Sequence, residues 1–569
     1  MVTERVDDIP LIASILDRVS LSNLIDEHFS AHGNWSGVSL GKVAVTFIIY
    51  VLSRGDHRIS HVETWAEERL HILRFVLREP NFNSKDVNDT RLGLVLERLS
   101  HSERWKLFEQ SLNRSVIRVY DLNMREPIRL DATIAQSFQA PGGLIQYGFS
   151  KQHRSDLPQL KVMLATLDPL AMPLFSIIAP GNKADDGLYG PIESQVMECL
   201  ATLGVVRGLL FVGDCKMGSV GNRFFISQNG HYYLCPLGKT QCSTKEIMAY
   251  LEQKGNGTLN HVYKNEEKVL RAKVFEVEQE VLNPETGAIM KERRLIVYSV
   301  DYAKSQHFSF ESKLDKAQKE LEDMFARKQG KATPETMDEV RLKVSEIIRK
   351  QEVASFFSVQ IEEEKSVKQV RKYGDREAGI VETSQFHLNI TRLNEAVSQH
   401  EQTLGWRVYA TNAPFEELDG VQAVEHYRNE YKIEHVFNDL MNKMTALSPI
   451  FLQKQTRIKA LIQLLLVALK FSCLIQHEAR TNLKNTGQSI NELYPGNPKR
   501  ATREPTTNLM LSAMKNITLV IYFVNNQSFA KVTNLKPIHE KILKLLNLNL
   551  DVYLNLEQIL LSSGNLTET

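Results

Sequence analysis

Two short runs decide how this chain folds: Ile128-Arg-Leu-Asp-Ala-Thr-Ile134 and Leu209-Leu-Phe-Val-Gly-Asp214. Both have the apolar character of buried strands. Asp131 lies inside the first run, where a carboxylate is costly to bury unless it is paired or binds a cation. Asp214 ends the second run, and an open α/β sheet exposes its functional groups at strand ends. The two runs therefore predict a sheet that carries two acidic groups.

The sequence around these runs continues the α/β pattern from about residue 127 to residue 237. Alternating apolar runs predict strands, and amphipathic spacing predicts helices between them. The further expected strands are Leu160–Leu167, Pro173–Ile178 and Tyr232–Leu237, and the expected helices are Tyr189–Leu203 and Val220–Ser227.

A glutamate on a later helix completes the acidic set. Residues 421–444 have helical spacing. Within them Tyr427, Tyr431 and Glu434 recur at positions i, i+4 and i+7, so we expect them to share one helix face.

Each acid also has an ordinary structural explanation. Asp214 could cap the helix that follows it, Asp131 could be one partner of a structural ion pair, and Glu434 could lie on a solvated helix face. The order of the three groups favours a catalytic interpretation: an acid within a strand, an acid at a later strand end, and then a glutamate on a helix.

Several blocks of sequence occur in a familiar order over roughly residues 125–480. They are Leu130-Asp-Ala-Thr133, Tyr147-Gly-Phe-Ser-Lys-Gln-His-Arg-Ser-Asp-Leu-Pro-Gln159, Gly181-Asn182, Asp214-Cys-Lys-Met-Gly-Ser219, Tyr427 to Phe437, and Ser448-Pro-Ile-Phe451. In this set the chain resembles insertion-sequence DDE transposases, whose ribonuclease-H-like core is interrupted by a β-rich insertion domain before the final Glu.

The resemblance implies DNA cleavage and strand transfer at Asp131, Asp214 and Glu434, which would hold Mg²⁺ or Mn²⁺, as two ions. Two divalent ions about 3.5–4 Å apart activate an attacking hydroxyl and stabilise the leaving oxygen. Carboxylate oxygens suit these hard cations. The implied partners are double-stranded DNA, in the form of the element's terminal inverted repeats and of the target, and a second copy of the chain in a homodimeric synaptic complex.

The resemblance also implies a set of DNA-contacting residues: Tyr427, Arg428, Lys432, Lys443, Lys151 and Arg154. The last two belong to the block 147–159, which could also be a solvated connection. The family's helix carries an Arg and a Lys where this chain has Glu430 and Met441, and position 216 is Lys rather than a small residue. These departures favour, as an alternative, a non-catalytic DNA-binding protein derived from a transposase. A nuclease that cuts without joining strands is a third possibility.

The composition is that of a folded protein with several domains: 569 residues, 43% hydrophobic and 24% charged. The net charge of +1 is not the basic balance typical of a nucleic-acid binder. Residues 454–515 nevertheless hold ten Lys or Arg against three acids, which indicates either a phosphate-contacting face or a solvated helix surface. The five cysteines form no CxxC pair, which argues against a zinc site.

The sequence also predicts where the protein acts. The first residues, MVTERVDD, lack the pattern of a signal peptide. The longest apolar stretches, Val43–Leu52 and Leu464–Leu469, are too short to span a bilayer. We therefore expect a cytoplasmic bacterial protein with reduced thiols, associated with the nucleoid when bound to DNA and without a membrane partner.

The expected fold class is α/β, with a ribonuclease-H-like mixed sheet as its core. We expect a helical N-terminal domain for DNA-end binding or dimerisation (1–125), the first part of the core (126–237), an inserted β-rich α+β module (238–405), the second part of the core (406–480) and a helical C-terminal region (481–569). Within the module, a strand hairpin should turn at Asn283-Pro-Glu-Thr-Gly287. Two charged helices, 314–325 and 337–348, should form a solvated helical hairpin.

Overall fold

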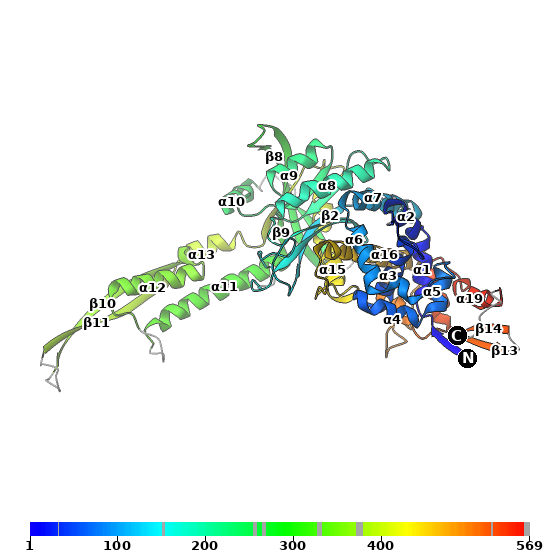
Figure 1. Cartoon of the computed structure of the whole chain (residues 1–569). Coiled ribbons are helices and arrows are strands. Elements are labelled where there is room, and N and C mark those ends of the chain that lie inside the picture. The colour runs from blue at the N-terminus through cyan, green and yellow to red at the C-terminus, as the bar shows by residue number, and fades with distance from the viewer. Residues whose placement is uncertain are drawn as a thin grey trace. The chain divides into compact units, whose positions relative to one another are not determined.

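The chain is a mixed α/β protein of two compact units, traced in Figure 1. A computed structural model describes residues 1–31, 33–150, 154–253, 259–264, 269–326, 333–370, 379–524 and 527–562. The first unit comprises Met1–Cys235, Leu282–Met290 and Glu425–Thr569, and the second comprises Pro236–Val281 and Lys291–Val424.

The N-terminal part of the first unit is helical, as the sequence predicts, apart from one short strand. The strand is β1 (Val2–Arg5). The helices are α1 (Ile9–Asp17), α2 (Leu21–His28), α3 (Leu40–Arg54), α4 (Val62–Glu67), α5 (Leu70–Val76), α6 (Asp89–Leu99) and α7 (Ser102–Val119), with 3₁₀ turns η1 (Ile59–His61) and η2 (Ser84–Val87). Asn88 caps α6, because its side chain accepts a hydrogen bond from the Arg91 backbone nitrogen.

Five strands of the first unit pair in the order β4-β3-β2-β5-β6. They are β2 (Ile128–Gln136), β3 (Gln159–Leu167), β4 (Met172–Pro180), β5 (Leu210–Gly213) and β6 (Tyr232–Pro236), and α8 (Asp186–Ala201) and α9 (Val220–Gln228) follow β4 and β5. The central strand β2 is antiparallel to β3 and parallel to β5. The strands and helices predicted for this region are confirmed to within a few residues at their ends.

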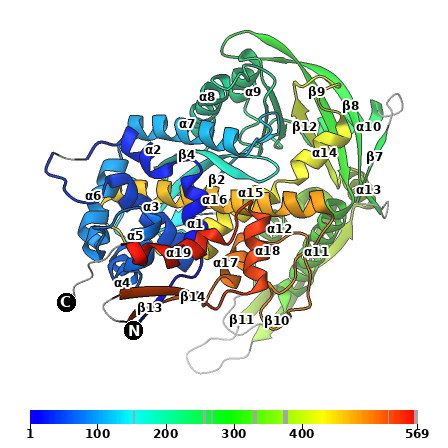
Figure 2. The ribbon, with the colours of Figure 1, turned by 90° about the vertical axis from the view of Figure 1, so that its right-hand side faces the viewer.

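A long apolar helix, α16 (Gln455–Thr486), packs against β4, α3 and α6. Of the described helices it alone is long and apolar enough to cross a membrane, and 89% of its apolar window is buried inside the protein. The core helix of a packed domain has the same composition. Figure 2 shows α16 running among the helices of the first unit.

The C-terminal region is not purely helical, contrary to our expectation. It contains α17 (Thr507–Ala513), β13 (Thr518–Val524), β14 (Gln527–Thr533), α18 (Pro537–Leu545) and α19 (Asp551–Ser562). The strand β13 pairs with β14 on one side and with β1 on the other, where Val2 lies opposite Ile521. The Tyr553 hydroxyl donates a hydrogen bond of 2.8 Å to the backbone oxygen of Asp7, so the two ends of the sequence are packed together.

The second unit contains a sheet in the order β12-β9-β8-β7. Its strands are β7 (Asn260–Lys264), β8 (Val269–Leu282), β9 (Ile289–Ser299) and β12 (Trp406–Thr411), and α10 (Thr244–Gln253) precedes them. The predicted hairpin turn forms, with the Asn283 nitrogen donating to the Ala288 oxygen. The run 406–411, which the sequence predicts as a strand of the second part of the core, forms β12 and pairs with β9.

The charged helices of the second unit are not a solvated hairpin, which corrects a second expectation. Helices α11 (Val300–Glu322) and α12 (Met337–Lys350) lie along a two-stranded ribbon, β10 (Phe357–Val370) and β11 (Gly379–Arg392), as Figure 1 shows. One face of each helix is buried against apolar side chains of the ribbon, so only the opposite face is solvated. The remaining elements are 3₁₀ turns η4 (Asp323–Phe325) and η5 (Ala354–Phe356) and helix α13 (Asn394–Glu401).

Candidate active site

Two adjacent parallel strands place Asp131 and Asp214 at the same level of the sheet. Leu130 on β2 lies opposite Gly213 on β5, and the next residue on each chain segment is the aspartate. Both aspartates are half-buried. The pairing of β2 with β5 therefore brings together two carboxylates that are far apart in the sequence.

Asp214 shapes the turn that follows β5. Its Oδ1 accepts hydrogen bonds from the Tyr189 hydroxyl at 2.7 Å and from the backbone nitrogens of Lys216 and Met217 at 2.8 and 3.3 Å. It does not cap α9, because Ser219 is the N-cap of that helix. The helix-cap explanation of Asp214 is therefore wrong, and these three hydrogen bonds from described residues all go to the single oxygen Oδ1.

The Tyr189 hydroxyl is a positioning group that the sequence did not reveal. Tyr189 is buried on α8, and burial together with the charges of Asp214 and Asp131 raises its pKa well above 10. The phenol therefore stays protonated and can only donate to the Asp214 carboxylate. In sequence, a tyrosine on an apolar helix face is indistinguishable from an ordinary core residue.

The helix that carries Glu434 is interrupted, which corrects the prediction of one continuous helix over 421–444. Helix α14 (Gly420–Arg428) ends before α15 (Tyr431–Asn438), and a π-helical turn, η6 (Asp439–Lys443), follows. Tyr427 therefore lies on a different helix from Glu434. The exposed Glu434 lies in the first turn of α15, which packs against β2.

Glu430, at the break between the helices, adds a fourth carboxylate. Burial raises the pKa of Glu430, and the nearby charges of Glu434 and Asp214 raise it further, whereas a hydrogen bond from Tyr427 lowers it. A small cavity here is lined by Arg129, Leu130, Asp131, Val212, Gly213, Tyr427, Glu430 and Ile433. We call Asp131, Asp214, Glu430 and Glu434 the acidic group.

A closed ion pair lies beside the acidic group on the same strand. The Arg129 guanidinium holds Asp168 with Nε–Oδ1 and Nε–Oδ2 distances of 2.9 and 3.0 Å and an Nη2–Oδ2 distance of 2.6 Å. Both side chains are almost fully buried, at 2% and 3% exposed. Arg129 is thus committed to Asp168, although its charge also reaches Glu430.

The donor set of the acidic group fits a hard divalent cation in kind, since carboxylate oxygens are the preferred ligands of Mg²⁺ and Mn²⁺. Burial raises the pKa of Glu430, and the charges of Glu434 and Asp214 raise it further, so gathering these carboxylates is unfavourable without a cation. Among the described residues, no three His, Cys, Asp or Glu side chains are already arranged as a closed set of metal ligands.

The expected DNA-contacting residues have varied surroundings. Lys432 Nζ lies 4.0 Å from Asp168 Oδ2, and Arg154 pairs with Asp156 in an exposed ion pair. Tyr427 bonds to Glu430, and Arg428 is half-buried on α14. Lys151 and the side chain of Lys443 lie outside the described residues.

Part of the positive charge of residues 454–515 is bound in contacts within the protein. Lys454 and Arg457 both pair with Glu97, at 3.0 and 2.9 Å. Lys470 is buried, and its side chain bonds to Asn113. These contacts favour a structural role for much of this positive charge over a continuous phosphate-contacting face.

Comparison with known proteins adds one domain match. Residues 1–112 match DUF4277, a domain of unknown function. No curated protein sequence matches the chain. One solved structure that aligns is the cryo-EM structure of a piggyBac transposase synaptic complex with hairpin DNA, with a TM-score of 0.34 and 9% identity over 98% of this chain and 86% of the other. At this TM-score the similarity carries no argument about fold or function.

Proposed function

We propose that this protein is a transposase that cleaves DNA strands and transfers them with the help of divalent metal ions. The observation that carries the proposal is the register of β2 and β5, which places Asp131 and Asp214 at the same level of the sheet, beside β2's contact with α15, the helix that carries Glu434. The central place of β2 and its pairing with the fourth strand of the sheet are the arrangement expected of a ribonuclease-H-like core.

In this proposal Asp131, Asp214 and Glu434 hold Mg²⁺ or Mn²⁺. Two such ions would supply activation of the attacking hydroxyl and stabilisation of the leaving oxygen of the phosphodiester. Tyr189 fixes Oδ1 of Asp214 by donating its hydroxyl hydrogen, and Oδ2 would be the oxygen that binds the metal. Arg129 and Asp168 neutralise one another beneath the site and so hold β2 in place without adding charge.

The DNA partners follow from the same proposal. Terminal inverted repeats of an element and a target duplex would be joined in a homodimeric complex. Tyr427, Arg428, Lys432, Lys443, Lys151 and Arg154 are the residues proposed to contact the DNA. Lys432 would have to leave the neighbourhood of Asp168 to do so, a movement of one flexible side chain.

A second candidate is a non-catalytic DNA-binding protein derived from a transposase. The observation that favours it is the identity of Glu430, an acid at the position where the family's helix carries an arginine. Because Glu430 belongs to the acidic group, it adds negative charge where a phosphate would approach.

A nicking assay beside a gel-shift assay separates the two candidates. The substrate is a supercoiled plasmid that carries the genomic DNA flanking the gene, incubated with Mg²⁺ or Mn²⁺. The parent should nick it, and Asp214→Ala should lower the nicking rate roughly 100-fold or more because a metal ligand is lost. Binding in the gel shift should persist. Asp89→Ala, which removes an exposed acid at the start of α6, is the matched control.

Two results would count against the catalytic assignment. If Asp214→Ala nicks as fast as the parent, Asp214 does not bind the metal ion that the reaction requires. If the parent binds the DNA but nicks it with neither metal, the non-catalytic candidate is correct.

A further inference from the structure

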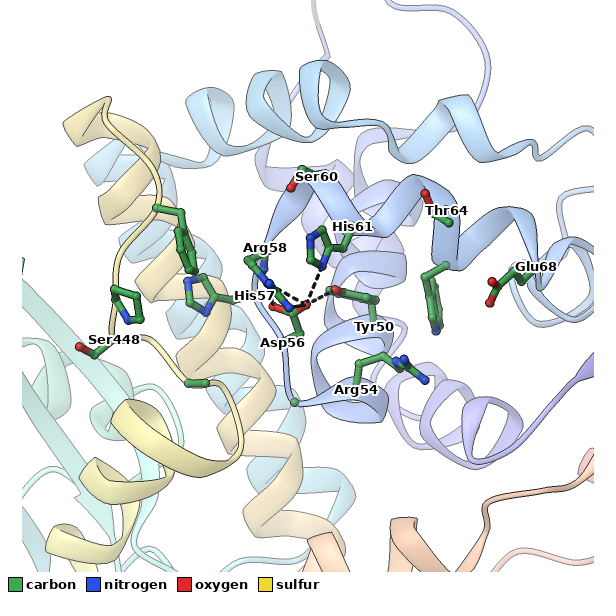
Figure 3. Close-up of a pocket in the computed structure, with 15 residues that line it drawn as sticks. Tyr50, Arg54, Asp56, His57, Arg58, Ser60, His61, Thr64, Glu68 and Ser448 are labelled. Atoms are coloured by element: carbon green, nitrogen blue, oxygen red, sulfur yellow. Dashed lines mark hydrogen bonds and ion pairs between the residues drawn. The ribbon is translucent and has the colours of Figure 1, made fainter.

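A second hollow lies in the first unit, away from the acidic group and mostly within the DUF4277 match. It has a volume of about 630 Å³, a size typical of ligand-binding pockets. One wall is formed by the end of α3, the turn η1 and α4, and the other by residues 446–451 (Figure 3). We call it the N-terminal pocket.

The centre of the N-terminal pocket is a closed set of polar contacts. Asp56 accepts hydrogen bonds from the Tyr50 hydroxyl at 2.6 Å and from Arg58 Nε at 2.9 Å, and His61 Nδ1 lies 3.3 Å away. Figure 3 shows these contacts converging on Asp56. The arginine and the hydrogen bonds hold the pKa of Asp56 well below its usual range, so the pair of Asp56 with Arg58 is electrically neutral.

One positive charge at the pocket remains uncompensated. Glu68 is paired with Arg69 at 2.8 Å, and Asp56 is paired with Arg58. The exposed guanidinium of Arg54 has no ion pair or hydrogen bond with any residue in the described ranges. The pocket therefore offers the charge that matches one monoanion, such as a phosphodiester.

Two residues that line the pocket each have a buried polar atom that lacks a partner within the described chain. His57 is 3% exposed, and its Nδ1 lies 3.0 Å from the backbone oxygen of Thr445. Because a carbonyl only accepts, Nδ1 carries the hydrogen, and the unpartnered Nε2 is an acceptor. Burial lowers the pKa of His57, which keeps the ring neutral. Trp65, 5% exposed, has an unpartnered Nε1 donor.

An exposed aromatic ring stands over this end of the pocket. Phe451 is 56% exposed, and its ring centroid lies 5.6 Å from that of His57 with 32° between the planes. A large apolar ring left in solvent at a pocket rim is a surface on which another flat ring stacks.

We propose that the N-terminal pocket binds one unpaired deoxynucleotide of a DNA strand, with its base stacked on Phe451, an N–H of the base edge donating to His57 Nε2, and its phosphodiester at Arg54. A base supplies the flat ring and the N–H donors that His57 Nε2 requires, and its phosphodiester supplies the single negative charge. In a duplex the base would be stacked and its edge paired, so the nucleotide has to be extrahelical. The choice of DNA over another nucleotide source rests on the proposed function.

The test compares two 30-base-pair duplexes of one sequence, where one has a single extra unpaired 2-aminopurine and the other is fully paired. The parent should bind the bulged duplex roughly tenfold more tightly in fluorescence anisotropy, and stacking should quench the 2-aminopurine. Phe451→Ala and His57→Asn should bring the affinity ratio close to one. The asparagine keeps a donor for Thr445 and removes the Nε2 acceptor, while Phe451 is exposed and can be changed without disturbing folding.

Arg54→Ala should weaken binding of the bulged duplex and lower the slope of log affinity against log salt by about one. Arg78→Ala, which removes an exposed arginine that lines a different hollow, should change neither quantity.

The outcomes separate the pocket from the proposed function. A parent that binds both duplexes equally, or a bulge preference that survives both Phe451→Ala and His57→Asn, overturns the pocket alone. A parent that binds neither duplex overturns the pocket together with DNA binding.

Discussion

The strand β2 carries two charged side chains in contrasting surroundings: Arg129 lies in a neutral ion pair, and Asp131 lies among other carboxylates. Arg129 forms a closed pair with Asp168 in which both side chains are buried and the charges cancel. Two residues further along, Asp131 belongs to the acidic group, where burial raises the pKa of Glu430 and the like charges of Glu434 and Asp214 raise it further. A buried ion pair is tolerated only while both partners are present. A cluster of carboxylates, in contrast, lowers the stability of the fold until a cation binds to it.

The largest effect should come from breaking the closed pair. Asp168→Asn should lower the free energy of unfolding by about 3–5 kcal/mol, because it leaves the Arg129 charge buried and uncompensated. The measurement is urea unfolding followed by circular dichroism.

The matched control for this change is Asp156→Asn. It breaks an arginine–aspartate pair of similar geometry whose side chains are 51% and 63% exposed, so solvent screens the pair and its loss should change the free energy of unfolding far less. Equal losses in the two variants would show that burial does not distinguish the pairs.

An intermediate effect on stability should come from a buried acid that belongs neither to the ion pair of Arg129 and Asp168 nor to the acidic group. Glu193 is fully buried, its carboxylate oxygens have no hydrogen-bond partner in the described part of the chain, and burial raises its pKa to about 8. Between the unfolded pKa near 4.5 and about 8, the folded state keeps a proton that the unfolded state loses. Stability from this group is therefore complete below pH 4.5 and falls as the pH rises towards 8.

Glu193→Gln should remove that dependence. At pH 8 the variant should be more stable than the parent by about 1–3 kcal/mol, and the difference should shrink towards pH 5. Unfolding free energies of both proteins across this pH range are the measurement. A difference that does not change with pH would mean that Glu193 does not titrate in this window.

The smallest effect on the free energy of unfolding should come from a change in the acidic group. It should be a gain in stability, whereas Asp168→Asn should cause a loss. Glu430→Gln removes one negative charge that the folded state disfavours, so the metal-free protein should gain about 0.5–1 kcal/mol at pH 8, discounted because solvent reaches part of the side chain. The gain should decline as the pH falls and Glu430 takes up a proton. A loss of stability in EDTA would contradict the view of this group as mutually repelling.

The sequence predicted the strands that carry the two aspartates, because their apolar runs are flanked by clear breaks. It could not predict the register that sets Leu130 opposite Gly213, since register depends on contacts between distant segments. The break before α15 was also missed, because Asn429 and Glu430 include neither Gly nor Pro. The sequence did not reveal the hydrogen bond of Tyr189 to Asp214, and it marked Glu430 only as the replacement of an arginine, because both contacts arise only when the sheet and the helices meet.

The ribbon of the second unit shows a different limit. Its strands β10 and β11 are rich in charged residues, and only one face, at Val359, Ile361, Leu388 and Ile390, packs on the helices. Such sparse apolar alternation resembles a solvated segment when read alone. The expectation that α11 and α12 are solvated failed because their partner was not recognised.

The pairing of β1 with β13 has a consequence for how the protein is made. Residues 2–5 are synthesised before their partner strand, which follows on the order of 500 residues later, roughly 25–100 s at bacterial or eukaryotic elongation rates. Until then the N-terminal segment has an unpaired strand edge, and α1 lacks the contact that α19 supplies. A ribosome that stalls after α16 would thus release a chain in which β1 lacks β13 and α1 lacks α19. The first unit can therefore assemble fully only after β13 and α19 have been synthesised.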